Sequence, residues 1–200
     1  MRLRLVLIGD GPSDDVLLHP IRWSLRQQVP EVELLESPFV FRRHRPVAEV
    51  IQEAMEAWRP DLVVVHRDTE REDPEVRRRE IPYADSVVPL VPVRMTEAWL
   101  LLDESAIRRA VSRPRATNDL QLPRLRQLEA RPNPKADLET ALLLAAGDPT
   151  GRARRRVQDD LSMLKRRVAE NIDDYTPLRN LTAFQRWEED LAAALAGRLR

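Results

Sequence analysis

The sequence predicts an α/β fold, in which a mostly parallel sheet is flanked by helices and followed by a C-terminal helical extension. Strand-like apolar runs alternate with helix-like patterns in the first half of the chain, as they do in βαβ units. Residues 62–65 read Leu-Val-Val-Val, and a run without a polar face is typical of a strand buried on both sides of a parallel sheet. From residue 104 onward the patterns are helical, which predicts the extension.

The first half begins with an apolar run that ends at Gly9 and leads through a tight turn into a helix. Ser13 is expected to cap this helix, because a Ser side chain accepts hydrogen bonds from the free N–H groups of a first turn. Proline has no N–H to donate, so Pro38 interrupts the second strand, and two prolines place the fourth near a sheet edge. The expected strands are residues 4–9, 32–41, 61–66 and 87–93, and the expected helices follow Ser13 and span 47–58 and, as a helix or turn, 95–102.

The second half is expected to consist of helices, with Asn133 and Thr182 as helix-start residues. Residues 1–103 are therefore expected to form the α/β core, and residues 104–200 a helical extension packed on it. The expected helices of this extension are residues 104–111, 122–130, 135–146, 152–171 and 177–199.

Composition and charge limit the chemistry. The 200 residues include no cysteine, which excludes disulfides and thiolate metal sites. Residues 1–103 hold 14 Lys and Arg against 19 Asp and Glu, and residues 104–200 hold 19 against 14. This split suits an acidic centre beside a basic surface that contacts phosphates, and it suits two solvated helix faces equally well. The apolar run at the N-terminus is too short to span a bilayer and lacks a signal-peptide cleavage pattern, so we expect a cytoplasmic protein without membrane contact.

Acidic residues stand where the expected parallel strands end. Because these ends share one edge of the sheet, the carboxylates are expected to converge there, and a cation is needed to offset their repulsion. Mg²⁺, or Mn²⁺ in its place, is the natural partner of such oxygen ligands, and it supports phosphoryl or phosphodiester chemistry. The candidate metal ligands are Asp10, Asp14, Asp68, Glu70 and Glu97, of which Asp10, Asp68 and Glu97 are also the candidate catalytic residues.

Each candidate has a structural alternative. Asp14 or Asp15 is, taken alone, more simply a helix cap than a ligand. Glu70 lies in a charged stretch and is equally compatible with solvation, and Glu97, within an apolar segment, needs either Arg94 or a metal as its partner. The neighbours of Asp68 also have structural alternatives. His66 suits core packing better than base catalysis, and Arg67 or Arg71 can bind either a phosphate or a local Glu.

Three segments carry a family resemblance. Residues 8–14 (IGDGPSD), 63–70 (VVVHRDTE) and 95–101 (MTEAWLL) resemble an uncharacterised bacterial family of Toprim-like proteins, and residues 176–179 with Phe184 resemble its closing helix. Its wider relatives are the overcoming-lysogenization-defect nucleases, topoisomerases and primases. The resemblance implies a Toprim/Rossmann-like fold that holds magnesium through acids after two strands. Asp10 stands where the family usually has Glu, Asp14 matches the second acid of the nuclease-type motif, Asp68 and Glu70 match an Asp-x-Asp pair, and Glu97 matches a further nuclease acid.

The resemblance implies a magnesium-dependent nuclease, or a related phosphoryl-transfer enzyme, that acts on nucleic acid, in defence against mobile elements and beside a partner ATPase. The chain has no G-x-x-x-x-G-K-[ST] phosphate-binding loop, so ATP would be handled by that partner. A receiver-like phosphoacceptor is a second hypothesis, although the two lysines, Lys135 and Lys165, both fall in expected helices. A third is a non-catalytic Toprim-like scaffold that binds a partner.

Overall fold

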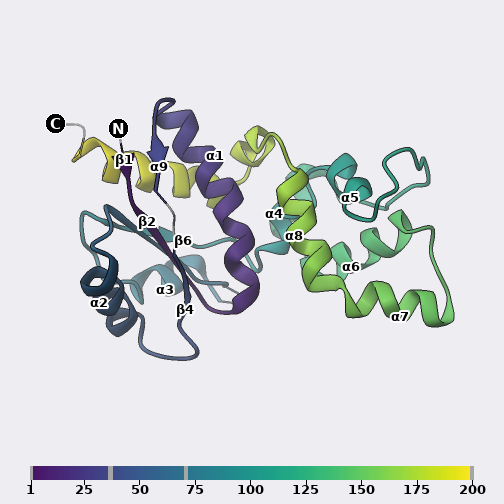
Figure 1. Ribbon diagram of the computed structural model, residues 1–200, viewed down its shortest axis with the longest axis horizontal. Helices are drawn as coiled ribbons and strands as arrows, with labels where there is room; N and C mark the ends of the chain where they lie inside the picture. Colours follow the sequence, from purple (N-terminus) through teal and green to yellow (C-terminus); the bar gives the residue numbers. More distant parts are fainter. Residues whose placement is uncertain (1, 36–37, 70–71, 199–200) are drawn as a thin grey trace. The chain divides into compact units, whose positions relative to one another are not determined.

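The computed structural model describes residues 2–35, 38–69 and 72–198, and it confirms an α/β fold (Figure 1). The chain divides into two compact units, one of Met1–Val93 with Thr182–Arg200 and one of Arg94–Leu181. This division differs from the expected boundary after residue 103. Residues 94–103 group with the helices, and the last helix of the chain groups with the sheet. The first of these is the sheet unit and the second is the helical unit.

The sheet unit is built on four parallel strands in the order β4-β2-β5-β6. The central strand β5 is fully buried, as its apolar run predicts, and β6 lies at the edge, as its prolines predict. A separate parallel pair joins β1 to β3. The strands are β1 (Arg2–Leu3), β2 (Leu5–Gly9), β3 (Glu33–Leu34), β4 (Phe39–Phe41), β5 (Leu62–His66) and β6 (Val87–Leu90).

The second strand, expected over residues 32–41 with an interruption at Pro38, is two short strands. They belong to different sheets, since β3 pairs with β1 and β4 pairs with β2. Between them Pro38 accepts a hydrogen bond from the backbone N–H of Leu7 at 3.1 Å. Proline has no N–H with which to continue a ladder, so the pairing changes in this region.

Helices cover the sheet of this unit on its two faces (Figure 1). Alternate strand residues, such as Val6 and Val63, pack against Val50 and Ala54 of the helix α2. The helices α1 and α9 are in contact: the indole N–H of Trp187 on α9 donates to the hydroxyl of Ser24 on α1 at 3.3 Å. The helices of the unit are η1 (Pro12–Leu17), α1 (Leu18–Gln28), α2 (Val47–Trp58), α3 (Pro74–Arg79) and α9 (Thr182–Ala196).

The helical unit differs from the expected pattern at three places. The helix expected over residues 122–130 is a 3-10 helix over Leu125–Ala130. The expected helix over residues 152–171 is two helices that meet at Asp160, and the segment expected over 177–199 is a short 3-10 turn followed by α9 of the sheet unit. Asn133 caps α6 as expected, since its side chain accepts from the N–H of Ala136 at 3.1 Å. The elements are α4 (Glu97–Leu100), α5 (Glu104–Ala110), η2 (Leu125–Ala130), α6 (Pro134–Ala145), α7 (Gly151–Asp159), α8 (Leu161–Asn171) and η3 (Thr176–Asn180).

Within residues 2–35, 38–69 and 72–198, none of the helices combines the length and the apolar character needed to cross a bilayer.

Candidate functional site

The candidate site lies at the carboxyl ends of β2 and β5, which are neighbours in the sheet. From β2 the chain goes on to β4 at one side, and it later returns to β5 at the other side. Ligands of open α/β sheets bind at such a point, because the connections diverge there and leave a crevice at the strand ends. Asp10 directly follows β2, and Asp68 lies two residues after His66, the last residue of β5.

Asp10 is held by two arginines from separate parts of the sheet unit. The Nε atom of Arg42, which follows β4, lies 2.5 Å from Oδ1 of Asp10, and the Nε atom of Arg67 lies 3.1 Å from the same oxygen. Burial by itself raises the pKa of Asp10, but the hydrogen bond from Arg42 and the positive charges of Arg67, Arg42 and His66 outweigh it. The pKa of Asp10 is therefore below its ordinary value, and this carboxylate is ionised at neutral pH.

Asp14 caps the turn that follows β2. Its Oδ2 atom accepts a hydrogen bond from the backbone N–H of Gly11 at 2.9 Å, so Gly11, and not the expected Ser13, is the N-cap residue of η1. The side chain is buried, and the same oxygen lies 3.7 Å from Nε2 of His66. A Cβ atom on Gly9 would lie 2.9 Å from Cβ of Asp14, so the carboxylate approaches this closely only because residue 9 is glycine. Both the capping role and the approach to the candidate site are thus present in one residue.

His66 connects Asp14 to Asp68. Its Nδ1 atom lies 3.2 Å from the carbonyl oxygen of Leu90, which can only accept, so Nδ1 carries a proton. Its Nε2 atom lies 3.3 Å from Oδ1 of Asp68. Burial lowers the pKa of His66, but Asp68, Asp14 and Asp10 outweigh burial and raise the pKa to about 9. His66 is therefore an imidazolium at neutral pH and neutralises the carboxylates beside it.

The protein's own cations thus balance the converging acids. Three carboxylates meet two guanidinium groups and one imidazolium, and Arg67 also pairs with Glu80. In the parts of the chain that the structure describes, no group of three or more His, Asp or Glu side chains has the spacing of a metal site. The oxygen donors suit Mg²⁺ in kind, and Asp10 and Asp68 each keep 28% of the side chain exposed. A Mg²⁺ ion bound by one or two carboxylates, its waters and a substrate phosphate is compatible with this set.

Of the two remaining acid candidates, only Glu97 is among the described residues. Glu97 belongs to the helical unit, where its Oε1 atom lies 3.0 Å from Nζ of Lys165 and both side chains are buried. This lysine satisfies the need for a partner that the sequence raised for Glu97, and the ion pair is sufficient to account for the buried carboxylate. Glu70 and Arg71 lie outside the described residues.

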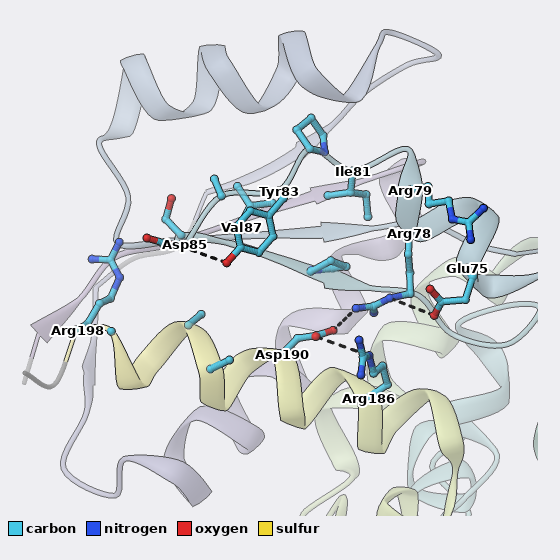
Figure 2. A pocket seen from close by; sticks show the side chains of 17 residues that line it. Glu75, Arg78, Arg79, Ile81, Tyr83, Asp85, Val87, Arg186, Asp190 and Arg198 are labelled. Carbon is cyan, nitrogen blue, oxygen red and sulfur yellow. Dashed lines mark hydrogen bonds and ion pairs between the residues drawn. The ribbon is translucent and has the colours of Figure 1, made fainter.

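A separate hollow of about 920 Å³ lies between α3, the start of β6 and α9, and it does not include the candidate acids (Figure 2). The Nη2 atom of Arg78 lies 2.5 Å from Oδ2 of Asp190, and Arg186 lies 3.8 Å from the same carboxylate. The hydroxyl of Tyr83 donates to Oδ1 of Asp85 at 3.4 Å, two residues further along the same segment (Figure 2). Arg78 and Arg186 are thus paired with an acid of the same hollow, and Arg198 pairs with Asp61 outside it.

Sequence reasoning did not identify Arg42, and it assigned His66 to packing. Arg42 stands in the run Arg42-Arg43-His44-Arg45 directly after a strand, which is a signal of the same kind as the strand-end acids. Comparison with known proteins adds no relative: no family model, no curated protein and no solved structure matches the chain.

Proposed function

We propose that the chain is a metal-dependent enzyme of Toprim type that hydrolyses phosphodiesters or transfers phosphoryl groups of nucleic acid. The observation that carries the proposal is the convergence of Asp10, Asp14 and Asp68 on His66 at the ends of two neighbouring parallel strands. The crevice at such a position is where open α/β sheets bind their ligands. A partner ATPase and a role in defence against mobile elements remain predictions from the family resemblance.

The side chains divide naturally into roles. Asp10 and Asp68, the two partly exposed carboxylates, would hold Mg²⁺ or Mn²⁺, and Asp14 would keep His66 and the β2 turn in place. When bound, the ion would polarise a phosphoryl oxygen and lower the pKa of a bound water. Arg42 and Arg67 would then contact substrate phosphate oxygens, since a guanidinium pairs with phosphate as it does with carboxylate. Neither Glu97 nor Glu70 is needed for this assignment.

The test is cleavage of labelled single-stranded DNA, duplex DNA and structured RNA with Mg²⁺, with Mn²⁺ or with chelator. We expect metal-dependent products from the wild type and their loss in Asp68→Asn, which removes a charge without changing shape. Asp85→Asn is the matched control, because Asp85 is an exposed acid of the same unit that lines the separate hollow. Absence of cleavage of all three substrates, or equal loss of activity in both variants, would contradict the proposal.

A second candidate, the non-catalytic scaffold, is favoured by one observation. Arg42, Arg67 and protonated His66 already compensate the acids, so the cluster is electrostatically stable without a metal. Calorimetric titration with MgCl₂ separates the two candidates: an enzyme site gives a binding heat that Asp68→Asn abolishes, and a scaffold gives none. The receiver-like candidate requires a lysine that holds the phosphoryl group, and Lys165 is already buried in an ion pair with Glu97.

A further inference from the structure

The loop that follows β4 contains a tight turn of four basic residues beside the candidate site. The backbone N–H of Arg45 donates to the carbonyl oxygen of Arg42 at 2.9 Å, and the two residues between them, Arg43 and His44, have φ angles of +48° and +66°. These features define a type I′ turn. The turn begins at Arg42, whose side chain contacts Asp10.

The residues in this turn contradict the local preference of the backbone. Type I′ turns favour Asn-Gly, because both central residues adopt left-handed conformations that a larger side chain disfavours. Arg43 and His44 occupy those two positions. Backbone strain of this kind tends to occur at functional sites, where a side chain is needed in spite of its conformational cost.

The four side chains of the turn divide into two pairs. Arg42 pairs with Asp10, and Arg45 pairs with Glu53 of α2, so the two ends of the turn are fixed. Arg43 and His44 are exposed and face no acid among the residues that the structure describes. The guanidinium of Arg43 lies over the ring of Phe41, 4.6 Å from its centre, which restrains this side chain while its N–H groups stay available.

We propose that Arg43 and His44 form a phosphate-contacting element that holds a nucleic-acid backbone next to the acids of the candidate site. The inference rests on the proposed function, and it adds the residues that recognise the substrate outside the reacting centre. Arg42 links the element to the acids, since its backbone N–H donates to the carbonyl oxygen of Gly9 at 3.0 Å and its side chain contacts Asp10. A phosphate bound by the turn would therefore be adjacent, along the nucleic-acid backbone, to a phosphate placed at Asp10.

The test is the double variant Arg43→Asn with His44→Gly, which installs the preferred turn sequence. Because the strain is removed, we expect the melting temperature to rise by a few degrees, so a loss of binding cannot be ascribed to unfolding. Binding of a fluorescein-labelled single-stranded oligonucleotide is measured by anisotropy in EDTA, in the absence of cleavage. We expect roughly tenfold weaker binding, and a slope of log K against log salt that is smaller by about 1.

Arg155→Asn is the matched control, because Arg155 is an exposed arginine of α7 without a described partner. It removes the same charge and should leave affinity and salt slope nearly unchanged. Competition by inorganic phosphate at low millimolar concentration would identify an isolated phosphate as the ligand, whereas competition by unlabelled oligonucleotide alone identifies the polymer. The inference is overturned if the wild type does not bind, or if the double variant binds as tightly as the control. Loss of binding in a protein that cleaves nothing would support this inference and contradict the proposed enzymatic activity.

Discussion

The Nε2 atom of His66 lies 3.3 Å from Oδ1 of Asp68, inside the sheet unit and out of contact with solvent. Since Nδ1 faces the carbonyl of Leu90, Nε2 is the nitrogen that gains and loses the titrating proton. The imidazolium supplies a positive charge in the middle of the acid cluster. The ionisation of His66 therefore links the stability of the sheet unit to pH.

The first prediction concerns this link. The folded state raises the pKa of His66 from its ordinary 6.5 to about 9, so the stabilisation is fully present below pH 6.5 and is lost as the pH rises through 9. Protonation of His66 therefore adds on the order of 3 kcal/mol to the free energy of unfolding. Urea unfolding of the wild type should show stability falling across this window, and His66→Asn should remove the dependence. An unchanged slope in the variant would contradict the assignment.

The second prediction concerns the close packing under Asp14. A Cβ at position 9 would lie 2.9 Å from Cβ of Asp14 and 3.0 Å from the ring of Phe39, so Gly9→Ala should destabilise the fold by about 1–3 kcal/mol. Gly11→Ala is the control, because a Cβ there meets nothing within 4 Å and the φ angle of −142° suits any residue. Thermal unfolding of both variants checks this. Equal effects would mean that the approach of Asp14 does not require the glycine.

The third prediction concerns the buried ion pair of the helical unit. Glu97→Gln leaves the Lys165 ammonium buried without its counter-charge, and we expect a loss of about 3–5 kcal/mol. The double variant Glu97→Leu with Lys165→Met should recover most of this loss, because apolar side chains replace both charges. Glu170→Gln, an exposed change on the same helix as Lys165, is the control. If Glu97 acts only as a metal ligand, the double variant will show no recovery.

The fourth prediction concerns α9, which the structure assigns to the sheet unit. Trp187 is buried against α1, so Trp187→Ala should cost about 3–5 kcal/mol and should expose the amides of β6 to hydrogen exchange. Arg186→Ala, one residue earlier on the exposed face, should change stability by no more than about 0.5 kcal/mol. Retained protection of β6 in Trp187→Ala would show that the sheet does not depend on this helix.

The strand pattern was readable from the sequence because it is local. A run such as Leu62–His66 has no polar face, and a parallel sheet covered on both sides is the environment that accommodates it. The order of the strands could not be read. The segment over residues 32–41 was predicted as one strand interrupted at Pro38, and the sequence did not show that its two parts pair with different partners. Strand pairing depends on which strands come to lie side by side in the folded chain, and the hydrophobic pattern of a single sequence does not contain this information.

By itself the sequence predicted that Asp10 and Asp68 share one edge of the sheet, because the carboxyl ends of parallel strands lie on the same edge. The tertiary structure decided that their two strands are neighbours. Only the tertiary structure decided what neutralises these two carboxylates. Arg42 and Arg67 approach Asp10 from positions 32 and 57 residues along the chain, and Lys165 reaches Glu97 across 68 residues. Charge pairing over such separations depends on how the whole chain packs, whereas burial and strand periodicity are recorded in consecutive residues.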